Sequence, residues 1–109
     1  LHPNMYDQAF VRENAELFEG DYVDVQFRPF EAATGRSALG EFQQWMAETG
    51  GEVTELAMVG WINATMAFDG LLAAGPDFDR QKVIDATNTF EDYTAGGLVV
   101  PVDWEFAHT

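Results

Sequence analysis

The chain has 109 residues, of which 47% are hydrophobic, so its composition fits one packed domain and argues against a disordered tail. Nineteen acidic residues face five basic ones, giving a formal net charge of −14 that disfavours nucleic acids and anionic membrane surfaces as partners. The absence of cysteine excludes disulfides, thiolate nucleophiles and zinc–thiolate sites.

The acidic residues are spread along the whole chain. This distribution favours a solvated acidic surface, and the alternative is an acidic patch for a cationic ligand or partner.

The first 36 residues predict one short helix and one strand. Residues 6–17 have the pattern of a modest amphipathic helix. Residues 22–30 alternate with a period of two, which places Val23, Val25 and Phe27 on one face of a half-buried strand. Pro29 ends this strand because it has no N–H to donate to a neighbour.

Two helices are predicted next, over residues 37–49 and 54–74. Ser37 and Thr54 are suitable N-caps, and Gly75-Pro76 is a strong stop signal. The first helix has an apolar stripe of Leu39, Phe42, Trp45 and Met46. The second is apolar nearly all round, so we expect a buried helix and not a membrane span.

The last third predicts a helix, a turn and a strand. Asp79 caps a helix that runs to about Phe90, and residues 93–97 form a turn. Residues 98–106 alternate again, with Pro101 placing this strand at a sheet edge. Two strands some seventy residues apart offer too little sheet to cover these helices, so we expect the remaining strands to lie in sequence or chains outside these 109 residues.

Signals for catalysis are scarce. Ser37 is the only serine and lacks a nucleophile-elbow motif, while His2 and His108 lie at the two ends of the chain. No metal-spaced histidine cluster and no phosphate-binding glycine loop is present in the sequence. We therefore expect no catalytic residue, metal or cofactor, and a role in binding or assembly.

The order of short motifs resembles the C-terminal part of type I periplasmic solute-binding proteins of ABC transporters, the leucine/isoleucine/valine-binding type. The matching segments, in chain order, are residues 6–10, 19–23, 28–30, 60–64, 72–78, 79–86, 93–98 and 101–108. Each motif is weak alone, and their order and spacing together are moderately specific. Family members have two α/β lobes and are roughly three times longer.

The resemblance implies an α/β fold with flavodoxin-like lobes, of which this chain is a helix-rich fragment. Residues 1–22 would be the tail of the second lobe, 23–31 a hinge strand, 32–97 helices of the first lobe, and 98–109 a further hinge strand and exit. The implied protein is extracytoplasmic, in the periplasm or at the cell surface. It binds a small amino-acid-like or organic-acid solute between its lobes and delivers it to an ABC transporter permease.

Three residues are candidates for ligand contact on this resemblance: Arg28, Phe30 and Trp61. Arg28 would pair with a ligand carboxylate, although an arginine on the exposed face of a strand is more often solvated. Trp61 would approach the cleft, although a tryptophan at helical spacing is more often in the core.

Two alternatives stay open. One is a ligand-sensing regulatory domain of the same fold. The other is a free-standing helical interaction domain, which would be a monomer that melts cooperatively. A fragment of a larger receptor would instead be partly unfolded, aggregate, or form a homo-oligomer by exchanging elements with a copy of itself.

Overall fold

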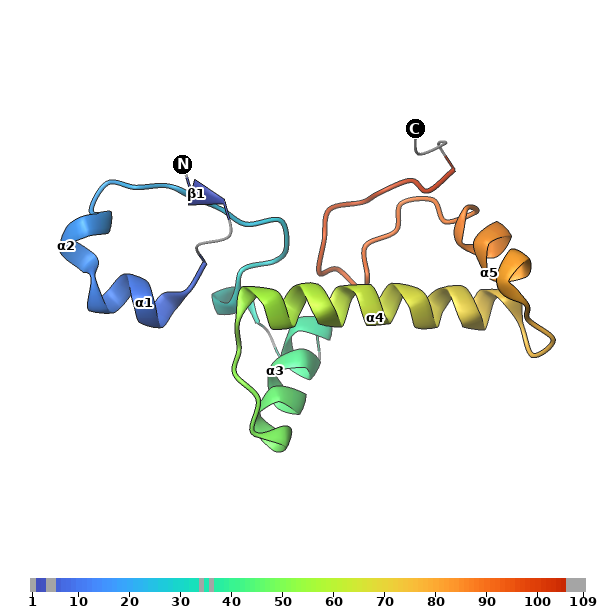
Figure 1. Ribbon diagram of the computed structural model, residues 1–109, viewed down its shortest axis with the longest axis horizontal. Coiled ribbons are helices and arrows are strands. Elements are labelled where there is room, and N and C mark those ends of the chain that lie inside the picture. Colours follow the sequence, from blue (N-terminus) through green and yellow to red (C-terminus); the bar gives the residue numbers. More distant parts are fainter. Residues whose placement is uncertain (1, 4–5, 34, 36, 106–109) are drawn as a thin grey trace.

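The computed structural model describes residues 2–3, 6–33, 35 and 37–105, and this part of the chain is helix-rich (Figure 1). Its helices are α1 (Gln8–Glu13), α2 (Ala15–Phe18), the 3₁₀ turn η1 (Phe30–Ala32), α3 (Ala38–Thr49), α4 (Glu55–Ala74) and α5 (Arg80–Thr87). Two-residue strands β1 (His2–Pro3) and β2 (Val23–Asp24) pair in parallel. This pairing is too short to form a layer against which helices pack.

The predicted starts of the three longer helices are confirmed. The side-chain oxygens of Ser37, Thr54 and Asp79 each accept a hydrogen bond, at 2.8–3.2 Å, from the backbone N–H three residues on. These bonds satisfy donors that have no partner within the helix. Gly75 ends α4 with a φ of 81°, which a side chain would strain.

The two predicted strands are largely wrong within the described residues. Of residues 22–30 only Val23–Asp24 is a strand, and of residues 98–105 only Val102 forms a bridge, with Tyr93. The reason is the lack of neighbouring strands, because an extended segment needs a partner for its N–H and C=O groups. Phe106, at the end of the second predicted strand, and His108, beyond it, lie outside the described residues.

The other departures are smaller. The first predicted helix breaks at Asn14 into α1 and α2, and α5 ends at Thr87, before Phe90. Trp45 was expected to pack with the apolar stripe of α3, but its side chain is 48% exposed. The buried face of α3 is therefore narrower than the apolar stripe in its sequence indicates.

The core is small and lies where α3 crosses α4. Its buried members are Phe27, Phe30, Leu39, Phe42, Met58, Ala95 and Leu98. They come from α3, α4, η1 and two segments without regular structure. The last of these, around Ala95 and Leu98, runs close to the middle of α4 (Figure 1).

Much apolar surface is left uncovered. The radius of gyration is 16.6 Å, against about 13 Å for a compact domain of about 100 residues. The accessible surface is 8009 Å², against roughly 6,000 Å² for a compact monomer of this mass. The difference exceeds the ~800 Å² that one partner buries in a standard protein interface.

Helix α4 contributes heavily to this exposure. Only Met58 and Gly70 of its residues are buried, so the expected burial of this helix is not met within the described chain. By length and composition α4 is apolar enough to cross a membrane. A core helix of a soluble protein passes the same test, so one such helix among the described residues is weak support for a membrane span.

Candidate functional site

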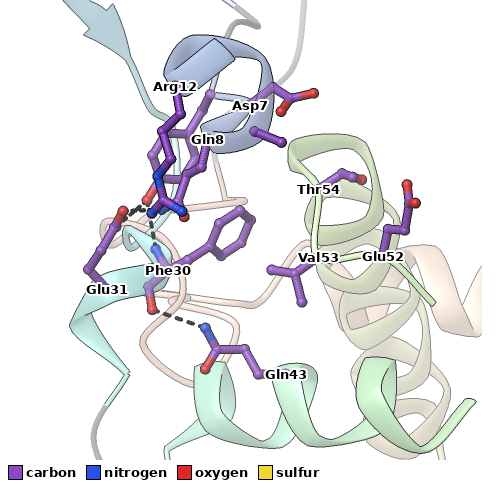
Figure 2. Close-up of a pocket in the computed structure, with 11 residues that line it drawn as sticks. Asp7, Gln8, Arg12, Phe30, Glu31, Gln43, Glu52, Val53 and Thr54 are labelled. Atoms are coloured by element: carbon purple, nitrogen blue, oxygen red, sulfur yellow. Dashed lines mark hydrogen bonds between the residues drawn. The ribbon is translucent and has the colours of Figure 1, made fainter. Parts of the chain in front are cut away.

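A hollow of about 540 Å³ opens beside Tyr6, and we call it the Tyr6 hollow. Three parts of the chain bound it: the start of α1, the η1 turn, and the segment that leads into α4 (Figure 2). Gln43 of α3 closes its base, where its Nε2 donates a hydrogen bond of 3.0 Å to the carbonyl of Phe30. Residues distant in sequence thus converge on one space of a size suited to a small molecule.

Tyr6 holds one wall of this hollow together. Its hydroxyl donates a hydrogen bond to Glu31 and accepts one from the backbone N–H of Phe30, at 3.0 Å. Gln8 donates from its side-chain amide to the other carboxylate oxygen of Glu31. The ring of Tyr6 stacks on Phe30 with centroids 5.0 Å apart. These contacts fix α1 against η1.

The Tyr6–Glu31 contact shifts the pKa of both side chains. Burial and the hydrogen bond to Glu31 raise the pKa of Tyr6 above its ordinary value of 10.0. The hydrogen bond from Tyr6, with help from the nearby charge of Arg12, lowers the pKa of Glu31 below 4.5. Glu31 is therefore ionised at neutral pH, with its two oxygens already engaged.

This geometry predicts a contribution to stability that depends on acid pH. A carboxyl group with a lowered pKa in the folded state stabilises the fold above its unfolded value and loses that contribution as pH falls through the folded value. Tyr6→Phe should therefore reduce the fall in stability below about pH 4.5, by at most about 1 kcal/mol because Glu31 is exposed. Urea unfolding at pH 3–7 measures this, with Tyr22→Phe as the control. An identical pH slope in wild type and Tyr6→Phe would contradict the prediction.

The two sides of the hollow differ in charge. Arg12 lies on the same side as Glu31, whereas Asp7 and Glu52 lie on the opposite side (Figure 2). One oxygen of Asp7 caps α1 by accepting from the N–H of Phe10 at 3.0 Å. Between the two sides, the ring of Phe30 points toward Val53. The site therefore combines apolar carbon with an excess of negative charge.

The three residues that the sequence singles out do not share one site. Phe30 is buried and lines the Tyr6 hollow. Arg28 is exposed and lines a groove of about 570 Å³ between residues 25–28 and 97–100. Trp61 is half-buried and lines a third hollow of about 490 Å³ between α4 and the turn at residues 95–96. Only Phe30 and Trp61 are linked, through rings that each contact Phe42.

The groove beside Arg28 brings together the two segments expected to be hinge strands. The backbone N–H of Arg28 donates a hydrogen bond of 2.7 Å to the carbonyl of Leu98. These residues are seventy positions apart in the chain, and neither belongs to a regular strand. Their contact is the main long-range backbone link between the first and last parts of the described chain.

Asp69, which lines the third hollow, belongs to a second tyrosine–carboxylate pair. The hydroxyl of Tyr93 donates to Asp69 at 2.7 Å, and burial together with this bond raises the pKa of Tyr93 well above its ordinary value. The Tyr93 ring stacks on Phe90, with centroids 5.2 Å apart. Asp69 thus ties α4 to the segment that follows α5, which explains a carboxylate in the second half of a largely apolar helix.

Among the described residues, no group of three or more His, Cys, Asp or Glu side chains is placed to hold a metal ion. No family model, curated protein or solved structure matches this chain.

Proposed function

We propose that this chain is part of the ligand-binding component of an ABC-type uptake system for a small amino-acid-like or organic-acid solute. In this proposal the protein is extracytoplasmic and delivers its solute to a transporter permease. The full protein would have the α/β fold of type I solute-binding proteins, with flavodoxin-like lobes. The chain itself would catalyse no reaction and need no cofactor.

The position of the Tyr6 hollow carries this proposal. Residues 6–12 belong to the segment that the family resemblance assigns to the second lobe, and residues 43 and 52–54 to the segment assigned to the first. Phe30 and Glu31, from the proposed hinge, lie between them. A solute in this space would touch both lobes at once.

Simultaneous contact of the solute with both proposed lobes gives the physical basis for a clamshell mechanism. A ligand shifts the equilibrium between open and closed forms only by its difference in affinity for the two. A solute held by one lobe alone would stabilise both forms equally. A solute that bridges the hollow stabilises the closed form, and the segments around Arg28 and Leu98 absorb the change in backbone angles.

The uncovered apolar surface also supports the proposal. Helices of an α/β lobe pack on a sheet, and the described chain offers only the two-residue β1–β2 pairing. An accessible surface well above that of a compact monomer is what a piece of such a lobe would have. It counts against the free-standing helical domain, which must cover its own apolar faces.

The proposal is tested by a thermal-shift screen, with amino acids and organic acids, of the full protein that contains this chain. A solute at a hundredfold excess over its Kd stabilises the folded form by about 2.7 kcal/mol, a rise of several degrees in Tm. Glycerol and sodium chloride at equal concentration control for general solvent effects. The proposal is contradicted if no solute in a broad panel raises Tm above these controls.

A further inference from the structure

We infer that Tyr6 is a positioning residue that clamps the proposed second lobe to the first when no solute is bound. The Tyr6 clamp consists of the hydrogen bonds that join Tyr6 to Glu31, Phe30 and Glu55. The inference rests on the proposed function, which assigns residues 6–22 to the second lobe and α3 and α4 to the first. It goes beyond that function by naming the contacts that set how much of the free protein is already closed.

The first argument is that Tyr6 forms hydrogen bonds in two directions. Its hydroxyl donates to Glu31 and accepts from the backbone N–H of Phe30 at 3.0 Å. Its own backbone N–H donates to a carboxylate oxygen of Glu55, in the first turn of α4, at 3.2 Å. Because Phe30 and Glu31 belong to η1, a single residue is bonded to η1 and to α4 at once.

The second argument is that η1 is itself fixed to the helices of the proposed first lobe. The carbonyl of Phe30 accepts a hydrogen bond of 3.0 Å from Nε2 of Gln43, on α3 (Figure 2). The ring of Phe30 stacks on Phe42, with centroids 6.1 Å apart and ring planes inclined by 18°. Phe30 is a buried member of the core. The bonds from Tyr6 to η1 therefore hold Tyr6 to the α3–α4 crossing.

The third argument is that Tyr6 leads directly into the segment that the clamp would hold. Asp7 caps α1 by accepting from the N–H of Phe10 at 3.0 Å, so a displacement of Tyr6 would move the start of this helix with it. Neither α1 nor α2 contains a buried residue, and both lie to one side of the α3–α4 crossing (Figure 1). Hydrophobic packing thus contributes little to holding these helices in place, and the hydrogen bonds at Tyr6 contribute correspondingly more.

A clamp of this kind acts on the affinity for every solute alike. When only a fraction of the receptor is closed, the apparent Kd equals the Kd of the closed form divided by that fraction, whatever the solute is. Loss of one hydrogen bond of the clamp should therefore weaken binding roughly three- to tenfold. A residue that touches the solute would instead affect different solutes to different extents.

Glu55→Ala is the sharpest variant, because Glu55 bonds Tyr6 without lining the Tyr6 hollow. Glu55→Gln keeps an oxygen that can accept from the N–H of Tyr6, and it should stay close to wild type. Glu41→Ala removes a carboxylate from the first turn of α3 and controls for the effect of charge at a helix N-terminus. Tyr6→Phe removes the hydroxyl bonds and keeps a ring that can stack on Phe30.

Small-angle X-ray scattering of the full protein that contains this chain, without solute, measures closure directly. Glu55→Ala and Tyr6→Phe should each have a larger radius of gyration than wild type, with unchanged far-UV circular dichroism. Glu55→Gln and Glu41→Ala should match wild type. If one of the two clamp variants fails to fold, the other carries the test.

Calorimetry with L-leucine, L-glutamate and succinate then tests the uniform effect. Glu55→Ala should weaken each of these solutes that binds by the same factor, and Glu41→Ala should leave the affinities unchanged. Losses that differ from one solute to the next would show that Glu55 contacts the solute, and they would overturn the inference.

The outcomes separate the clamp from the proposed function. A radius of gyration that neither Glu55→Ala nor Tyr6→Phe increases overturns the inference and leaves a solute receptor standing. If none of the three solutes binds, the scattering result alone decides the inference, and the thermal-shift panel decides the proposed function.

Discussion

Phe42→Ala is expected to leave the chain largely unfolded at 25 °C. Phe42 has no exposed surface and lies at the centre of the core. Its ring contacts Phe30 and Trp61, with centroids 6.1 and 5.6 Å away. Truncating a buried phenylalanine to alanine costs about 3–5 kcal/mol, through lost burial and the cavity that remains. A chain with seven buried hydrophobic residues among those described has little stability in reserve.

Trp45→Ala is the matched control, because Trp45 is an aromatic residue on the same helix with a side chain that is 48% exposed. Its loss should cost well under half as much. Urea unfolding followed by far-UV circular dichroism measures both variants without relying on tryptophan fluorescence. Equal free energies of unfolding for Phe42→Ala and Trp45→Ala would show that the α3–α4 crossing is not the centre of the fold.

The sequence predicts the helices well because their signals are local. The capping oxygens of Ser37, Thr54 and Asp79 lie three residues from their donors, and the stop at Gly75-Pro76 needs no distant partner. The predicted strands form only in small part, because a strand needs a neighbouring strand to pair with. The alternation over residues 22–30 indicates an apolar face but does not provide that neighbour. The α/β fold expected around these helices stays a prediction.

The candidate site was much harder to predict. The sequence names Phe30, which does line the Tyr6 hollow, but it gives no sign that Tyr6 bonds Glu31, 25 residues away, or that Tyr93 bonds Asp69. Such pairs arise from how elements pack, and one sequence records no spacing that reveals them. Glu52 carried no signal either, because an acidic residue in an acidic chain resembles ordinary solvated surface.

The isolated chain should self-associate through the exposed side of α4, and salt should promote this. Phe68 and Leu72 lie four residues apart on one face of α4 and are 61% and 64% exposed, and burying a leucine or phenylalanine side chain gains roughly 1.5–3 kcal/mol. The net charge of −14 opposes association, and its repulsion is screened as the Debye length falls from about 10 Å at 0.1 M to about 3 Å at 1 M salt. Sedimentation at rising NaCl should show a growing weight-average mass.

A double variant, Phe68→Gln with Leu72→Gln, tests whether this face of α4 is the surface responsible. It should weaken association at least tenfold, since about 1.4 kcal/mol corresponds to each factor of ten. Its Tm at low concentration should change little, because both side chains already face solvent. Leu17→Gln, at a position 76% exposed on α2, is the control for general loss of hydrophobicity. A chain that stays monomeric and melts cooperatively at every salt concentration would instead favour a free-standing domain. That result would mean that the fold is stable with the apolar face of α4 exposed to water, and that this face needs no partner.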